Sequence, residues 1–161
     1  MKSNIIWNKK KNFIINFSKL KKDLIERASV SKDKRSRICI HSSKKDLVQE
    51  MIICAFKNSF MPPHKHSELK SESYHIIEGK MDLYIFNDEG KVVDLINLKK
   101  NNSKNDSIFY YRSNNPNFWH MPVVKSKVCL FHEIFSGPFI KKKNIIFPKW
   151  INLIKDDHNK Y

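Results

Sequence analysis

The short segment PPHKH at residues 62–66, followed on the chain by Glu72, decides how this sequence is interpreted. Alternate residues of an extended strand face the same side, so His64 and His66 can direct two imidazoles into one cavity while Lys65 faces away. The connection between residues 66 and 72 is short, and it allows the next strand to present its carboxylate beside them. Together these side chains offer two imidazoles and one carboxylate, which are donor types of transition-metal sites.

A fourth donor, His120, lies far along the chain in the segment FWHMP at residues 118–122, which is also predicted to be a strand. An HxH pair alone is more often a surface or core feature than a ligand pair, and an isolated Glu is usually a solvated carboxylate. The combined spacing of the three histidines and Glu72 in one chain favours a metal site over these ordinary interpretations. We therefore expect one divalent transition metal ion, with Fe, Mn, Ni and Zn all compatible, held by His64, His66, Glu72 and His120.

The rest of the chain has the pattern of an all-β sandwich or barrel, because short apolar runs alternate with turn residues from residue 36 onward. Residues 87–90, Asn-Asp-Glu-Gly, have the usual composition of a hairpin turn. Residues 48–56 could form either a strand or a helix capped by Ser43, and we favour the strand. The expected strands are 37–41, 48–56, 60–64, 73–77, 80–86, 92–98, 108–111, 119–124 and 127–135.

A chain of 161 residues is long enough for one domain with a proper core. We divide it into a polar lead over 1–35, a barrel over 36–139 and an extension over 140–161. Within the lead, the helical spacing of Leu20 and Leu24 predicts a short amphipathic helix over 18–28, with Ser18 as its N-cap.

The formal charge of +15 invites a nucleic-acid interpretation, because binding to phosphates requires clustered Lys or Arg. Only four of the 31 basic residues are arginines, however, and the lysines are scattered and lack the bidentate fork that phosphate recognition favours. We therefore expect the tails to carry much of the charge, a small-molecule ligand, and no nucleic-acid partner.

The three cysteines, Cys39, Cys54 and Cys129, form no CxxC pair, and each lies in an apolar stretch. Buried, reduced thiols of a cytoplasmic protein fit this pattern better than a disulfide framework. The apolar pieces near the N-terminus are interrupted by Lys and Asn, so we expect neither a signal peptide nor association with a membrane.

The spacing of HxH, Glu72, six further residues and Gly79 resembles the first sequence motif of the cupin superfamily. His120 falls where the second cupin motif has its histidine, with Asn115 and Asn117 in place of that motif's proline and second glycine. This resemblance implies a double-stranded β-helix, a jelly-roll barrel whose histidines and glutamate bind a metal. It also implies a homodimer.

More narrowly, the chain resembles the WbuC-type cupin metalloproteins encoded among bacterial O-antigen and surface-polysaccharide genes. The matching segments are RSRICIH at 35–41, PHKH at 63–66, residues 72–79, FWH at 118–120 and EIFSGPF at 133–139. The resemblance implies an association with polysaccharide assembly and leaves the reaction open.

Glu133 alternates with Phe131 and Phe135, so we expect its carboxylate to face the barrel interior. Burial would raise its pKa unless a cation offsets the loss of solvation. Two roles remain equally open, a proton-transfer group in catalysis and a structural ion pair with Arg37 or Arg112.

Two classes of function remain. The first is an enzyme of the isomerase, epimerase, hydrolase or oxygenase type that acts on a small polar substrate such as a sugar or nucleotide sugar. The second is a non-catalytic module that binds a sugar or a metal and regulates a partner. The mouth of a small barrel suits both classes, so the fold does not choose between them.

Overall fold

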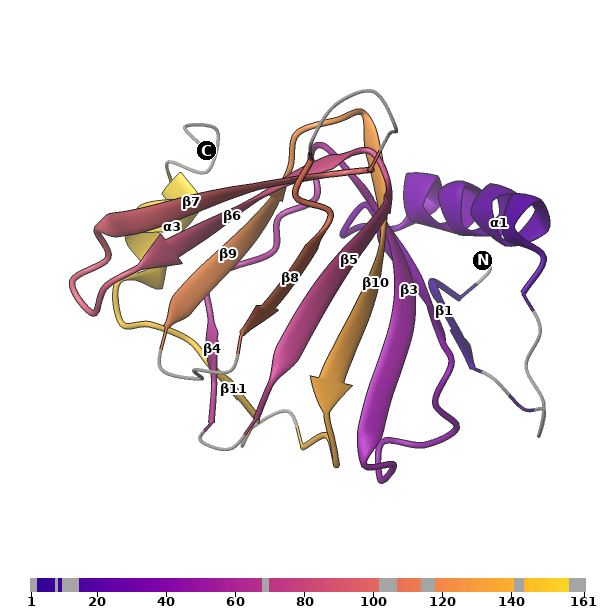
Figure 1. Ribbon diagram of the computed structural model, residues 1–161, viewed down its shortest axis with the longest axis horizontal. Helices are drawn as coiled ribbons and strands as arrows, with labels where there is room; N and C mark the ends of the chain where they lie inside the picture. Colours follow the sequence, from indigo (N-terminus) through magenta and orange to yellow (C-terminus); the bar gives the residue numbers. More distant parts are fainter. Residues whose placement is uncertain are drawn as a thin grey trace.

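The computed structural model describes residues 3–7, 9, 15–67, 70–101, 107–113, 118–140 and 144–156. Most of its regular secondary structure is strand (Figure 1). The strands are β1 (Ile5–Trp7), β2 (Arg35–Cys39), β3 (Val48–Phe56), β4 (Lys65–His66), β5 (Glu72–Glu78), β6 (Lys80–Phe86), β7 (Val92–Lys99), β8 (Tyr110–Ser113), β9 (Trp119–Val124), β10 (Val128–Ser136) and β11 (Ile145–Ile146). The helices are α1 (Phe17–Val30) and α3 (Ile151–Asp156).

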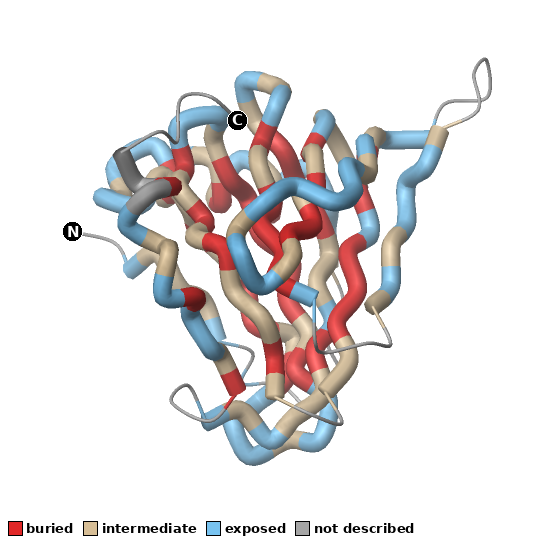
Figure 2. The backbone as a smooth tube through the Cα atoms, turned by 90° about the vertical axis from the view of Figure 1, so that its left-hand side faces the viewer, coloured by how far each residue is buried: buried red, intermediate tan, exposed pale blue. Residues whose placement is uncertain are grey.

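The strands form three sheets. A six-stranded sheet has the order β1-β2-β3-β10-β5-β8, a three-stranded sheet has the order β7-β6-β9, and β11 pairs with β4. Apolar side chains of the two larger sheets meet in one core cluster, which includes Met51 and Phe131 from one sheet and Met81 and Leu83 from the other. Buried residues occupy both faces of β3, where residues 51–55 are all buried (Figure 2). Ile53 faces the main core and Ile52 faces the cluster under α1, so this strand is covered on both sides.

The strands predicted over 80–86 and 119–124 are confirmed as β6 and β9 with the same bounds. The ambiguous run over 48–56 is strand β3, which pairs with β2 on one side and with β10 on the other. The strand predicted over 60–64 is wrong, because the structure has only the two-residue β4 that begins at Lys65. Pro62 and Pro63 have no N–H to donate to a ladder, which explains the short strand.

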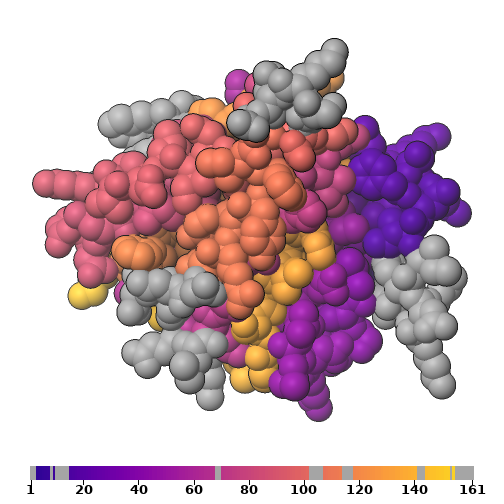
Figure 3. All heavy atoms as spheres, in the orientation of Figure 1, coloured from indigo at the N-terminus to yellow at the C-terminus, as the bar shows by residue number. Residues whose placement is uncertain are grey.

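Helix α1 confirms the predicted amphipathic helix and packs on the outside of the six-stranded sheet. Its buried Leu20, Leu24 and Ala28 face Ile38 and Ile52 of that sheet. The predicted N-cap was wrong: the side chain of Asn16, rather than that of Ser18, accepts a hydrogen bond from the first turn, from the N–H of Lys19 at 3.0 Å. The helix occupies the end of the molecule opposite the β6–β7 hairpin (Figure 3).

Both ends of the chain contribute strands that the sequence did not predict. β1 pairs in parallel with β2, and β11 pairs with β4. The C-terminal segment is attached to the β6–β7 turn by Trp150, whose indole N–H donates to the backbone carbonyl of Asp88 at 2.9 Å. The division at residues 35 and 139 therefore stays a prediction. In the part of the chain that the structure describes, no helix has the length and apolar character needed to span a membrane.

Gly79 connects β5 of the six-stranded sheet to β6 of the three-stranded sheet. Its φ is +88°, a left-handed conformation that favours glycine. A Cβ at this position would also collide with the backbone carbonyl of Val128. A larger residue would thus disturb the link between the two sheets.

Candidate metal centre

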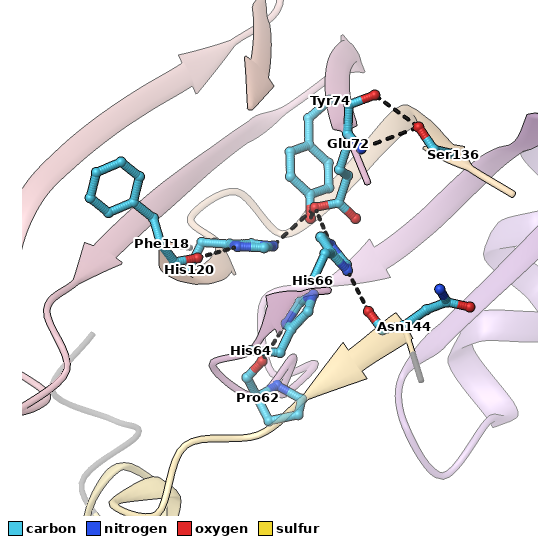
Figure 4. Close-up of polar contacts among 10 residues, drawn as sticks. Pro62, His64, His66, Glu72, Tyr74, Phe118, His120, Ser136 and Asn144 are labelled. Carbon is cyan, nitrogen blue, oxygen red and sulfur yellow. Dashed lines mark hydrogen bonds and ion pairs between the residues drawn. The ribbon is translucent and has the colours of Figure 1, made fainter. Parts of the chain in front are cut away.

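Four side chains from three sheets converge at one place in the barrel (Figure 4). Their candidate donor atoms all lie within 4.8 Å of one another. Two donors bound to one ion lie at most about twice the bond length apart, about 4.0 to 4.6 Å for bonds of 2.0 to 2.3 Å. The cluster therefore has nearly the dimensions of a mononuclear site, and its members are His64, His66, Glu72 and His120.

The local structure explains how each donor reaches this place. His64 immediately precedes β4 and exchanges two backbone hydrogen bonds with His120 of β9, at 3.0 and 2.8 Å. This bridge sets the two rings 4.3 Å apart between centroids. Strand β5 then presents Glu72 opposite Phe135 of β10, on the face that points inward.

The three imidazoles share one tautomer. In each ring Nδ1 lies near a backbone carbonyl: that of Pro62 at 2.9 Å for His64, that of Asn144 at 3.0 Å for His66 and that of Phe118 at 3.3 Å for His120. A carbonyl oxygen only accepts hydrogen bonds, so Nδ1 carries the proton and Nε2 keeps its lone pair. Metal-binding histidines are commonly oriented in this way.

One carboxylate oxygen is the meeting point of the cluster. Oε2 of Glu72 lies 3.1 Å from Nε2 of His66 and 2.9 Å from Nε2 of His120, and it accepts a hydrogen bond of 2.7 Å from the hydroxyl of Tyr74. The two Nε2 atoms are buried and, despite these short distances, make no hydrogen bond of acceptable geometry within the described residues. Two buried imidazole nitrogens that converge on one buried carboxylate oxygen fit a cation that the side chains would share.

The electrostatics of the cluster agree with this interpretation. Burial tends to raise the pKa of Glu72, but His120 and His66 outweigh it and hold that pKa well below the usual range. Burial and the neighbouring His120 lower the pKa of His64 to about 3, so its imidazole is neutral near pH 7. Burial also lowers the pKa of His66, yet the carboxylate of Glu72 leaves it raised overall. A cation would replace any proton shared between His66 and Glu72.

Glu133 faces the same interior from β10, where it pairs with Met51 and Tyr74 of the neighbouring strands. Burial, and after it the charge of Glu72, raise the pKa of Glu133 to about 7. No described residue forms an ion pair with it, so the ion-pair alternative with Arg112 is wrong. Arg112 lies opposite Ser73, is exposed and belongs to the outer face of the sheet.

Two polar residues near the motif stay outside the cluster. Lys65 extends over the ring of Trp119, with its Nζ 4.4 Å from the ring centroid. His75 pairs with His132 on the outer face of the six-stranded sheet and is exposed. Asn115 and Asn117, which the cupin resemblance places in the turn before His120, lie outside the described residues.

Two contributors to the site lie outside the set of site residues that the sequence predicted. Tyr74 follows Glu72 by two residues and therefore shares its inward face, a signal that strand alternation offers. Asn144 is buried, and its carbonyl reaches His66 from 78 residues away along the chain. No local pattern indicates such a contact.

Comparison with known proteins places this geometry in context. Residues 17–98 match the model of a family described as "Domain of unknown function (DUF6016)". No curated protein sequence matches the chain.

Solved structures share the fold at low sequence identity. A protein from Shewanella oneidensis has a TM-score of 0.62 at 10% identity, and the match covers 86% of this chain and 91% of that one. An uncharacterized conserved protein with a double-stranded β-helix domain from Klebsiella pneumoniae has a TM-score of 0.53 at 11% identity, covering 74% and 83%. KdgF from Halomonas sp. has a TM-score of 0.50 at 12% identity, covering 70% and 87%. The fold is thus the cupin-type double-stranded β-helix that the sequence predicts.

Proposed function

The chain belongs to the family described as a domain of unknown function (DUF6016), and we propose that it is a metal-binding cupin that acts on a small polar substrate. One divalent first-row transition metal ion, of which Fe, Mn, Ni and Zn are all compatible, would be held by His64, His66, Glu72 and His120.

One observation carries the proposal. Three histidines have Nδ1 directed at backbone carbonyls and thus Nε2 available as donors, and two of these Nε2 atoms converge on one oxygen of the buried carboxylate of Glu72. Three oriented imidazoles around one carboxylate form a donor set that suits a divalent ion. His64 is only partly buried, so the site keeps a side that solvent reaches.

When bound, such an ion supplies Lewis-acid polarisation of a carbonyl or hydroxyl, or an activated water. The residues of the chain would do the remaining work. Tyr74 orients the carboxylate of Glu72 through its hydroxyl, and Glu133 is placed to hold or release a proton. With a pKa of about 7, Glu133 can do either near neutral pH.

We propose a sugar or nucleotide-sugar intermediate as the substrate class, with a role in bacterial surface-polysaccharide assembly. Support comes from the resemblance of segments 35–41, 63–66 and 133–139 to WbuC-type cupins. A cytoplasmic homodimer with a small-molecule ligand, and without a nucleic-acid or membrane partner, is part of the same proposal. Size-exclusion chromatography with light scattering tests the dimer.

The proposal is tested by metal analysis of the purified protein and of single-residue variants. Wild type should retain about one ion per chain, and His66→Ala and His120→Ala should retain much less. His75→Ala is the matched control, because its imidazole lies on the outer face, and it should retain the ion as wild type does. Equal metal content in all four proteins, or none in wild type, contradicts the proposal.

A second experiment separates the enzyme from a binding module. Nucleotide sugars are incubated with the metal-loaded protein, and both binding and chemical change are followed by NMR. Conversion that is lost in Glu133→Gln while binding persists supports catalysis. Binding without conversion of any sugar supports the non-catalytic regulatory module.

A further inference from the structure

Strand β2 places two arginines on the interior face of the barrel. Its outward residues are Ser36, whose hydroxyl donates to the carbonyl of Leu24 in α1 at 2.6 Å, and Ile38, which packs under the same helix. Alternation therefore turns Arg35 and Arg37 inward, like Cys39, which belongs to the main core. Both arginines keep part of their surface accessible to solvent.

Neither arginine has an anionic partner within ion-pair distance among the described residues. Among the described residues, the side chain of Arg37 contacts the sulfur of Met51, with Nη1 3.8 Å from Sδ. Nε of Arg35 is buried and makes no hydrogen bond. Burial and then the charge of Arg37 lower the pKa of Arg35, so the two guanidinium groups lie close enough to repel each other. Two neighbouring guanidinium groups without an anionic partner repel each other, and an oxyanion would offset that repulsion.

The two arginines lie on the same interior surface as the metal-ligand cluster. In the strand register, Arg37 shares a row with Ile53 and Phe131, the next inward row contains Glu133, and the row after that contains Glu72. Successive inward rows are about 6.7 Å apart, so Glu72 lies about 13 Å from the row of Arg37 along the strands. Strands β2 and β5 are three places apart in the sheet, so the two residues are also separated by about 14 Å across the strands. The arginine side chain covers part of this separation, and a ligand would cover the rest.

Glu133, which lies between them, leaves the arginines available. It makes no ion pair with either arginine in the described chain, although both shift its pKa downward against the larger effects of burial and Glu72. Within the described chain, Arg35 and Arg37 therefore remain available to bind an anionic group of a ligand.

We propose that Arg35 and Arg37 form a subsite for an oxyanion group of the ligand that occupies the metal site. This inference rests on the proposed function and narrows its substrate class. The ligand would carry a phosphate or a carboxylate at the end remote from the ion. Guanidinium groups suit both oxyanions, because their planar forks match the two oxygen atoms.

The test compares three sugars that differ in charge. Full-length protein, with the ion that it retains, is titrated with glucose 1-phosphate, glucuronate and glucose in an isothermal titration calorimeter. At least one charged sugar should bind about 10-fold or more tightly than glucose, and the tighter of the two identifies phosphate or carboxylate as the group.

The variants are Arg35→Gln and Arg37→Gln, with Arg112→Gln as the matched control on the outer face. Either interior variant should reduce binding of the charged sugar by about 10-fold and leave glucose binding and metal content unchanged, whereas the control should bind as wild type does. Circular dichroism checks folding, and Arg37→Met, which keeps the apolar stem, replaces Arg37→Gln if the latter does not fold.

The outcomes distinguish the two proposals. Equal binding of all three sugars, or equal losses in Arg37→Gln and Arg112→Gln, overturns the oxyanion subsite while metal binding stands. A wild-type protein without bound ion overturns the metal site. In that case, charge-selective binding that depends on Arg37 would still support the subsite.

Discussion

The two ends of the chain pack against different parts of the barrel. The N-terminal helix α1 covers the outside of the six-stranded sheet with Leu20, Leu24 and Ala28, and its contacts there are mainly apolar. The C-terminal segment instead adds β11 beside β4 and directs the carbonyl of Asn144 at His66. One end therefore contributes mostly to stability, and the other contributes to the orientation of a candidate metal ligand.

The largest effect is expected from a substitution that weakens the packing of α1 on the six-stranded sheet. Leu24 of α1 is fully buried against the six-stranded sheet, so Leu24→Ala should lower the free energy of unfolding by about 2 to 5 kcal/mol. Urea unfolding of the metal-free protein measures it. The dissociation constant of the metal should stay close to that of wild type, and a large change in it would contradict the division between the two ends.

The next effect concerns the pH dependence of stability that Glu133 gives the barrel interior. The folded pKa of Glu133 is about 7 and its ordinary value is 4.5, so the folded state favours the protonated acid. This contribution to stability is fully present below pH 4.5 and is lost as the pH rises through 7. Partial exposure to solvent reduces its size to on the order of 2 kcal/mol.

Glu133→Gln should remove this dependence. Metal-free wild type should lose stability between pH 4.5 and 7 relative to the variant, as measured by urea unfolding at a series of pH values. Parallel curves for the two proteins would show that Glu133 titrates normally.

A smaller change in the free energy of metal binding is expected when the contact between the C-terminal segment and His66 is removed. A chain that ends at Phe139 lacks β11 and the carbonyl that accepts the Nδ1 proton of His66. Loss of such an outer partner typically weakens metal binding by about 10- to 100-fold. Competition with a chelator measures the affinity, and Leu24→Ala is the control for a general loss of stability. Unchanged affinity in the shortened chain would mean that β4 orients His66 without help.

The smallest effect concerns the surface of α1. Nζ of Lys21 lies 2.6 Å from a carboxylate oxygen of Glu78, and both side chains are partly exposed. Lys21→Gln should change the free energy of unfolding by only about 0.2 to 1 kcal/mol, and less at high salt. Thermal unfolding at two salt concentrations measures it, and an effect as large as that of Leu24→Ala would be inconsistent with an apolar role for the helix.

The sequence was sufficient for the parts of the fold that local periodicity determines. β6 alternates polar and apolar residues between Gly79 and the turn at residues 87–90, and β9 is a short, largely buried run; the bounds of both are as predicted. The helix cap was less determinate, because Asn16 and Ser18 are both good caps and lie two residues apart. The choice depends on how the chain approaches the sheet.

Most of the contacts that could not be predicted from the sequence depend on the register between paired strands. The strand predicted over 108–111 runs from Tyr110 to Ser113 instead, and without that register the outward position of Arg112 could not be known. The same holds for the separation between Glu133 and Arg37, which is set by pairing across three strands. Contacts between distant segments depend on how the sheets assemble, which no window of sequence contains.

Because the metal donors come from different sheets, a bound ion should affect the rate at which the protein unfolds. His66 belongs to the β11-β4 sheet, Glu72 to the six-stranded sheet and His120 to the three-stranded sheet. An ion bound to all of them would close the long loop between Glu72 and His120, much as a disulfide closes a loop. The layers could then separate only after the ion dissociates, so saturation with metal should slow unfolding and lengthen the lifetime of the folded state.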